Sequence, residues 1–181
     1  MTLQTPPHHL ELLHATLHLE RCRVILDPWA GDKAVHKGLR AGDSIVCLND
    51  KLGRGGVHLT FEPLEATLYH HVIKTFGQLN AIVTVPPIAL CDLALVNALE
   101  FASEVVCMLV PELWVLCSHD SRTSLFNQLE RESRLLCVVD ADPDNLLCWV
   151  VVFASASDRK RLLRTEHKLS DESRLVLRRC E

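Results

Sequence analysis

The chain has 181 residues, of which 48% are hydrophobic and only 5% aromatic, and its formal net charge at pH 7 is -4. This length suits one domain with a large core, and the dominance of Leu, Val, Ile and Ala is typical of a buried sheet with packed helices. The acidic balance disfavours a protein whose main task is to grip nucleic acid unaided, although it leaves room for a local basic patch.

The first half of the chain alternates helix and strand patterns. Pro6 and Pro7 suit the first turn of a helix, and Leu10, Leu13 and Leu17 share one face of that helix. Short apolar runs indicate strands, and apolar residues three or four apart indicate helices. We predict a strand over 23–26, a helix over 32–40, strands over 44–48 and 57–61, a helix with Leu64, Leu68, Val72 and Phe76 on one face, a strand over 81–85 and a helix over 90–102.

The second half ends in a predicted hairpin. We predict a strand over 104–110, a helix over 118–132, strands over 135–139 and 146–154, a helix over 157–167 and a polar tail over 169–181. Residues 140–145 are too few for a crossover helix, so the last two strands should be antiparallel. We expect one α/β domain over 1–168, followed by the tail.

The chain contains eight cysteines, and several lie in apolar runs such as 45–48 and 105–108. Cysteines in such positions behave as small core hydrophobes. The N-terminus has no apolar signal-peptide core, and no apolar run reaches transmembrane length. We therefore expect reduced thiols and an intracellular location of unassigned compartment, with no membrane association.

Two apolar runs end abruptly at polar or proline-bearing corners. Val24-Ile25-Leu26 leads into Asp27-Pro28-Trp29-Ala30-Gly31, and Ala81-Ile82-Val83-Thr84 leads into Val85-Pro86-Pro87-Ile88. Buried parallel strands end in this way at the carboxyl edge of an open α/β sheet, where ligands of such sheets bind. A glycine in the loop after a strand, such as Gly31, lets a ligand approach the main chain closely.

These two corners resemble the hallmark motifs of S-adenosylmethionine-dependent amino-methyltransferases that act on nucleic-acid bases. The motifs are a D-P-x-x-G cofactor loop and a later strand that ends in Asp/Asn/Ser-Pro-Pro-aromatic. The resemblance extends from Thr5 to about Arg164 and implies a three-layer, Rossmann-like methyltransferase fold, mostly parallel and ending in an antiparallel hairpin. It also implies S-adenosylmethionine as cofactor and, as ancestral chemistry, methyl transfer to an exocyclic amine of a base.

The resemblance implies a set of cofactor-binding residues: Thr5, Asp27, Pro28, Gly31, Asn49, Asp50 and Glu62. In this set Thr5 contacts the methionine end and Asp27 anchors its ammonium group. Either Asn49 or Asp50 binds the ribose hydroxyls, and Glu62 meets the adenine amino group. Taken singly, each is also an ordinary turn or helix-start residue. Lys33 stands where adenine amino-methyltransferases usually have a second glycine, so we expect cofactor binding to be weak or lost.

The catalytic corner departs further from the family pattern. Val85 stands where the family has a hydrogen-bond acceptor for the target amine, and Ile88 stands where it has an aromatic that stacks on the base. Thr84 is adjacent, but strand alternation directs its side chain the other way. Pro86 and Pro87 keep the loop shape without the chemistry. We therefore expect a degenerate methyltransferase or, alternatively, a non-catalytic interaction or structural module, with nucleic acid or a protein as partner.

Other groups of potentially functional residues give weaker signals. His70-His71 and Cys117-Ser118-His119 lack the ligand spacing of a metal site, so we expect no metal. The chain has no dinucleotide, P-loop or serine-hydrolase signature. Residues 158–181 carry an excess of basic residues that would suit phosphate contacts or, more simply, a solvated face. Trp114 would line a pocket near the site or pack in the core.

Overall fold

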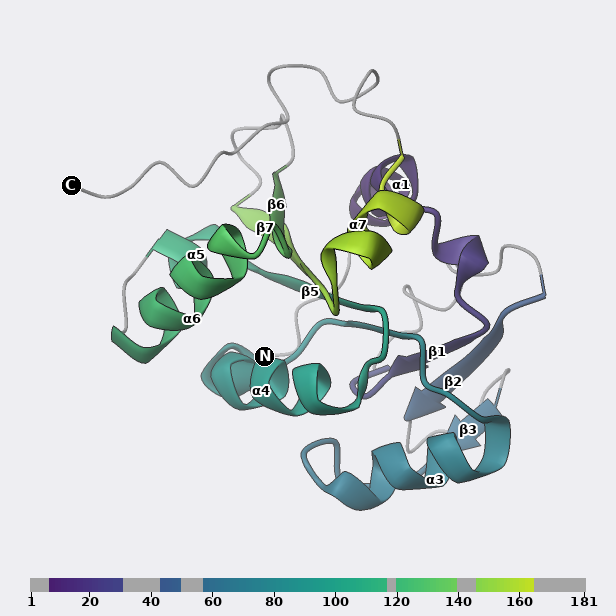
Figure 1. Ribbon diagram of the computed structural model, residues 1–181. Helices are drawn as coiled ribbons and strands as arrows, with labels where there is room; N and C mark the ends of the chain where they lie inside the picture. Colours follow the sequence, from purple (N-terminus) through teal and green to yellow (C-terminus); the bar gives the residue numbers. More distant parts are fainter. Residues whose placement is uncertain (1–6, 31–42, 50–56, 117–119, 140–145, 165–181) are drawn as a thin grey trace.

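The computed structural model describes residues 7–30, 43–49, 57–116, 120–139 and 146–164. These residues form three layers, in which a seven-stranded sheet lies between two layers of helices (Figure 1). The strands are β1 (Val24–Asp27), β2 (Ile45–Asn49), β3 (Val57–Leu59), β4 (Ala81–Thr84), β5 (Val105–Pro111), β6 (Leu135–Val139) and β7 (Leu147–Phe153).

The sheet is mostly parallel and has an antiparallel end. Its strand order is β3-β2-β1-β4-β5-β7-β6. Strands β1 to β5 pair in parallel, whereas β7 is antiparallel to both β5 and β6. Cys137 of β6 lies opposite Val150 of β7. The predicted hairpin is therefore confirmed, as is the predicted α/β fold class with its mostly parallel sheet.

Helices cover both faces of the sheet. The helical elements are α1 (Pro7–Thr16), η1 (Leu19–Arg21), α3 (Ala66–Phe76), η2 (Ile88–Leu90), α4 (Cys91–Phe101), α5 (Glu112–Leu116), α6 (Asp120–Arg131) and α7 (Ala156–Leu162). Helices α3, α4, α5 and α6 pack on one face, and α1 and α7 pack on the other (Figure 1). No helix in the described part of the chain is long and apolar enough to cross a membrane.

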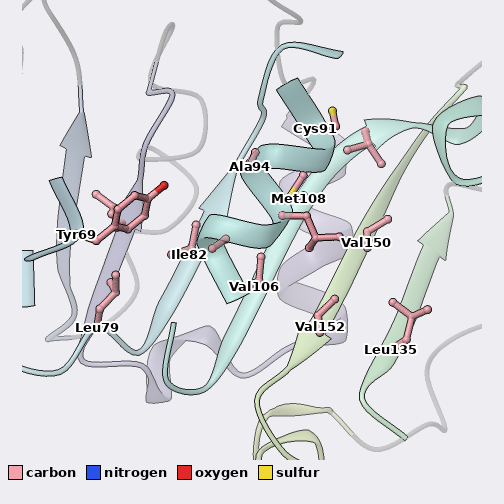
Figure 2. Packing of buried hydrophobic residues seen from close by; sticks show 14 of the residues in the cluster. Tyr69, Leu79, Ile82, Cys91, Ala94, Val106, Met108, Leu135, Val150 and Val152 are labelled. Carbon is pink, nitrogen blue, oxygen red and sulfur yellow. The ribbon is translucent and has the colours of Figure 1, made fainter. Parts of the chain in front are cut away.

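The core explains why the strands read as continuous apolar runs. Every residue of β1 and β4 is buried, because helices cover both faces of these central strands. Figure 2 shows Ile82, Val106 and Met108 of the sheet beneath Cys91 and Ala94 of α4. On the opposite face, Leu10 and Leu13 of α1 are buried, as their helical spacing predicts, and Leu17, one residue beyond the end of α1, is buried beside them.

Several element boundaries differ from the sequence prediction: the helix predicted over 157–167 ends at Leu162, and the helix predicted to include Leu64 begins at Ala66. Two further differences have local reasons. The strand predicted over 57–61 ends at Leu59, because the Asn49 side chain forms hydrogen bonds with both the N–H and the carbonyl of Phe61. Strand β5 extends through Pro111, whose missing N–H is tolerated at a strand end, and the unpredicted short helix α5 follows at once. The predicted helix over 32–40 and the polar tail lie outside the described residues.

Candidate functional site

The candidate site lies where the strand order reverses. Strands β1 and β4 are neighbours, yet the sheet is built outward from β1 through β2 and β3, and from β4 through β5. Open α/β sheets bind ligands in the crevice at the carboxyl ends of strands at such a point. Asp27 is the last residue of β1 and Thr84 is the last residue of β4. Both sequence corners therefore meet at this one edge.

Asp27 is held from both corners. The residue is only 1% exposed. Its Oδ1 accepts a hydrogen bond of 2.7 Å from the Thr84 hydroxyl and another of 3.1 Å from the backbone N–H of Trp29. A buried carboxylate without such donors would be very costly. These two bonds therefore fix the orientation of the Asp27 carboxylate at the end of β1.

Asn49 joins the loops around the same edge. Its Nδ2 donates to the carbonyls of Pro28 at 3.0 Å and of Phe61 at 2.8 Å. Its Oδ1 accepts from the Phe61 N–H at 2.9 Å. Both N–H donors of the Asn49 amide are therefore used. A ligand could only donate a further hydrogen bond to Oδ1. Sequence reasoning had no signal for this clamp, since it depends on where the chain lies after β3.

The other cofactor positions divide into described and undescribed ones. Glu62 follows Phe61 beside this edge with an exposed side chain, and its backbone carbonyl accepts from the Glu65 N–H at 3.0 Å. Thr5, Gly31 and Asp50 lie outside the described residues, as does Lys33. The structure thus brings Asp27, Pro28, Asn49 and Glu62 to neighbouring strand ends.

The catalytic corner carries no polar side chain from Val85 to Leu90. Val85 is half-buried and packs against the core cluster on the α1 side of the sheet, whereas Ile88 is exposed. The carbonyl of Pro87 accepts from the Leu90 N–H at 2.8 Å and from the Cys91 thiol at 3.6 Å. With the Thr84 hydroxyl directed to Asp27, the corner presents mainly apolar surface.

Trp114 packs in the core rather than lining an open pocket. Its ring meets Phe126 of α6 edge to face, with the centroids 5.8 Å apart. The Arg122 guanidinium lies 4.5 Å above the indole centroid, an arrangement that favours cation–π attraction. Arg122 Nη1 also lies 3.5 Å from Asp92 Oδ1 of α4. Sequence reasoning missed Arg122, because nothing in its local pattern links it to the end of β5.

Buried thiols near this edge are poor nucleophiles. Burial, assisted by the neighbouring Asp92 charge, raises the pKa of Cys91 to about 11, and burial raises that of Cys47 to about 12. Reactivity requires the thiolate, which these environments disfavour. Within the described ranges, no group of three or more His, Cys, Asp or Glu side chains could hold a metal ion.

The described part of the basic C-terminal region is engaged in structural contacts. Arg161 forms an ion pair of 2.7 Å with Glu104, and Arg164 forms one of 3.0 Å with Glu20. Arg159 donates to the Ser133 carbonyl at 3.1 Å. These partners favour the interpretation of α7 as a packed and solvated helix over that of a phosphate-binding surface.

Comparison with solved structures shows the fold. A class I S-adenosylmethionine-dependent methyltransferase from Listeria monocytogenes matches with a TM-score of 0.50 and 8% identity, over 81% of this chain and 58% of that one. A methyltransferase from Streptococcus mutans in complex with SAH matches with a TM-score of 0.48 and 10% identity, over 83% and 99% of the two chains. Magnesium protoporphyrin IX methyltransferase from Synechocystis, with bound SAM, matches with a TM-score of 0.46 and 9% identity, over 82% of this chain and 76% of that one.

No model of a protein family and no curated protein sequence matches the chain. The chain spans 58% of the length of the Listeria monocytogenes protein, and the identities are low enough that the likeness concerns the fold alone. The chain has the Rossmann-like fold of S-adenosylmethionine-dependent methyltransferases. The predicted fold is thereby confirmed.

Proposed function

We propose that this chain is a methyltransferase-type domain that binds S-adenosylmethionine weakly at the carboxyl edge of β1 and β2. Its ancestral chemistry is methyl transfer to an exocyclic amine of a nucleic-acid base, and we propose that this activity is lost. The observation that carries the proposal is the contrast between the two corners. The β1 corner keeps a buried, oriented carboxylate, whereas the β4 corner lacks a polar side-chain acceptor.

The residues present fit part of a cofactor site. Asp27 offers a carboxylate for the methionine ammonium, and its orientation is held by Thr84 and Trp29. Asn49 supports the loop after β1 through Pro28, so we assign ribose binding to Asp50 rather than to the Asn49 amide. Glu62 stands exposed after β3, where it would meet the adenine. Thr5, Pro28 and Gly31 complete the proposed set. The cofactor, when bound, supplies an electrophilic sulfonium methyl group.

The acceptor side lacks what an amine nucleophile needs. The lone pair of the attacking nitrogen must point at the methyl group during the transfer. The positive charge that develops on the nitrogen must be stabilised at the same time. The Val85 side chain offers no acceptor, and the neighbouring Pro87 carbonyl already accepts from the Leu90 N–H. Losing one preorganised polar group of this kind costs about 10²–10³ in rate, by analogy with oxyanion-hole deletions. Ile88 also removes a stacking platform worth about 1–3 kcal/mol per base.

A tritiated-methyl transfer assay tests the loss of activity. The substrates are single- and double-stranded DNA and RNA, and the wild type is compared with the double variant Val85→Asn, Ile88→Phe. An active methyltransferase in the same mixture controls for the assay itself. We expect no incorporation above the blank for the wild type. Robust turnover by the wild type would overturn the proposal and direct attention to Thr84 and Glu62.

A second candidate function is a non-catalytic interaction module on the methyltransferase fold. The observation that favours it is the exposure of large apolar side chains at and beside the catalytic corner, beginning with Ile88. A methyltransferase that acts on a polar base would gain little from such a surface, whereas a protein partner would bury it. The two candidates are compatible, since cofactor and partner would occupy different strand ends.

A further inference from the structure

The exposed large hydrophobic side chains of the described residues lie near the ends of two neighbouring strands and on α4. They are Ile88 (55% exposed), Leu93 (58%), Val96 (59%), Leu113 (63%) and Leu146 (60%). All five lie either at the carboxyl ends of β4 and β5 or on the outer side of α4, and we call them the apolar corner. A single exposed apolar residue is ordinary, whereas a local gathering marks an interaction site.

Strand pairing brings the members of the apolar corner together. Thr84, the last residue of β4, pairs with Met108, and β5 continues for three residues to Pro111, so the segments that lead to Ile88 and Leu113 leave the carboxyl ends of neighbouring strands. The Glu112 N–H donates to the Leu146 carbonyl at 2.7 Å, which places the chain at Leu113 beside that at Leu146.

Helix α4 extends the corner outward from Ile88. Leu93 and Val96 are three residues apart and therefore share one face of this helix. That face is solvent-exposed, because Cys91, Ala94, Leu95 and Ala98 are the α4 residues that pack on the sheet.

Acidic side chains predominate around the apolar corner, and Arg122 of α6, which lies beside α4, pairs with Asp92. The sequence contains no Lys, Arg or His between Lys74 and His119. Asp92 and Glu100 are exposed on α4 itself. The Asn97 side chain donates to the Leu64 carbonyl at 2.7 Å, which brings the segment with the exposed acids Glu62 and Glu65 alongside α4. The corner is therefore apolar with an acidic border.

We propose that the apolar corner docks a basic amphipathic segment of a partner protein. Apolar side chains of such a segment would cover Leu93 and Val96, as in other helix-in-groove complexes, and its Lys or Arg residues would meet the acidic border. Nucleic acid is disfavoured, because phosphate contacts need cations and this stretch of chain supplies none. The inference deepens the interaction-module candidate and rests on it; it does not depend on cofactor binding.

Fluorescence anisotropy with defined probes tests the docking proposal. The probe is a fluorescein-labelled amphipathic helix of leucine and lysine, and its counterpart has glutamate in place of every lysine. We expect the full chain to bind the lysine helix, more weakly as salt rises, and not to bind the glutamate helix. The double variant Leu93→Gln, Val96→Gln should weaken binding by about tenfold or more, since it removes two central apolar contacts.

Matched variants distinguish the effect of the acidic border on lysine-helix binding from the effect of the overall negative charge of the protein. Glu100→Gln should weaken lysine-helix binding by a few-fold, whereas Glu130→Gln, at an exposed acid of α6, should leave it unchanged. Thr75→Gln on α3 is the control for an exposed glutamine. Equal binding of the two helices, or unchanged binding by the Leu93→Gln, Val96→Gln variant, would overturn the proposal.

Two further outcomes would reassign the surface and so also overturn the proposal. One is binding of a labelled DNA duplex that the same double variant abolishes. The other is dimerisation, measured by sedimentation, that this variant abolishes. A parallel titration of S-adenosylmethionine into the same variant tests the cofactor proposal separately from the docking proposal. Heat of cofactor binding with no helix binding would overturn the docking proposal alone.

Discussion

The Thr84 hydroxyl donates a 2.7 Å hydrogen bond to the buried carboxylate of Asp27. This bond joins the end of β4 to the end of β1 and so links the catalytic corner to the cofactor corner. It also gives Thr84 a task other than catalysis. The hydroxyl that lies nearest in sequence to Val85 donates to the Asp27 carboxylate and orients it.

Replacement Thr84→Val should destabilise the fold and weaken cofactor binding together. Valine keeps the volume but leaves the Asp27 carboxylate with one donor fewer, and a hydrogen bond to a charged group is worth about 1.5–3 kcal/mol. Denaturant unfolding should therefore show a loss of about 2 kcal/mol. Thr84→Ser keeps the hydroxyl and should retain most of the stability. Thr75→Val, at an exposed position of α3, should change stability by about 0.5 kcal/mol or less.

Replacement Asn49→Ala should cost more than a single hydrogen bond. It removes three bonds and leaves the Pro28 carbonyl and both polar groups of Phe61 without their partner. Each buried group left unsatisfied costs about 1–3 kcal/mol, less where water can enter. Chemical denaturation measures the loss, with Asn127→Ala on the exposed face of α6 as control. A change no larger than that of the control would contradict the role of Asn49 as a clamp.

The cysteines should react slowly and make stability fall at high pH. Burial raises the pKa of Cys47 and Cys137 to about 12, and burial with the nearby Glu104 charge does the same for Cys22. Above the ordinary thiol pKa of 9.0 the unfolded chain loses these protons and the folded chain keeps them. The stabilisation is therefore full below about pH 9 and is lost between about pH 9 and 12, at up to about 1.4 kcal/mol per pH unit for each thiol.

Two measurements check the thiols. Urea unfolding at pH 8 and pH 10 should give the lower stability at pH 10, and equal stability would contradict the assigned burial. Titration with a thiol reagent under denaturing, non-reducing conditions should count all eight cysteines of the sequence as free. A lower count that reductant restores would show a disulfide and contradict the expectation of reduced thiols.

Replacement Lys33→Gly should strengthen cofactor binding. Lys33 lies outside the described residues, and the prediction rests on the family pattern, in which a glycine at this place lets the cofactor approach the main chain. We expect roughly tenfold tighter binding of S-adenosylmethionine, equivalent to about 1.4 kcal/mol. Replacement Lys74→Ala, at an exposed position of α3, is the control for loss of one positive charge. Unchanged affinity in Lys33→Gly would show that this lysine does not obstruct the loop.

The fold could be predicted because its signals are local. The apolar runs of β1 and β4 stop at corners that the sequence displays, and the short link between β6 and β7 allows only an antiparallel pair. Helix α5 escaped prediction, since a single turn after Pro111 is too short to show a period. Strand β3 was predicted too long, because its end is set by the Asn49 side chain and not by its own sequence.

The candidate site was predicted by position but not by contact. Asp27 and Asn49 were singled out because each follows a strand, and both do lie at the carboxyl edge. Their partners Thr84, Trp29 and Phe61 come from other parts of the chain, and no spacing rule connects them. Arg122 and Trp114 are only eight residues apart on consecutive helices, yet nothing in that spacing predicts that the guanidinium lies over the indole ring.

Calorimetric titration of S-adenosylmethionine into the full chain tests the central claim most directly. We predict measurable but weak binding, with a dissociation constant above about 1 µM, equivalent to a free energy weaker than about -8 kcal/mol. The heat should be strongly reduced in Asp27→Asn, which keeps the acceptor for Thr84 and Trp29 but removes the charge. Sub-micromolar affinity would contradict the damaged cofactor loop, and an absence of heat, or equal binding by Asp27→Asn, would contradict a cofactor site at Asp27.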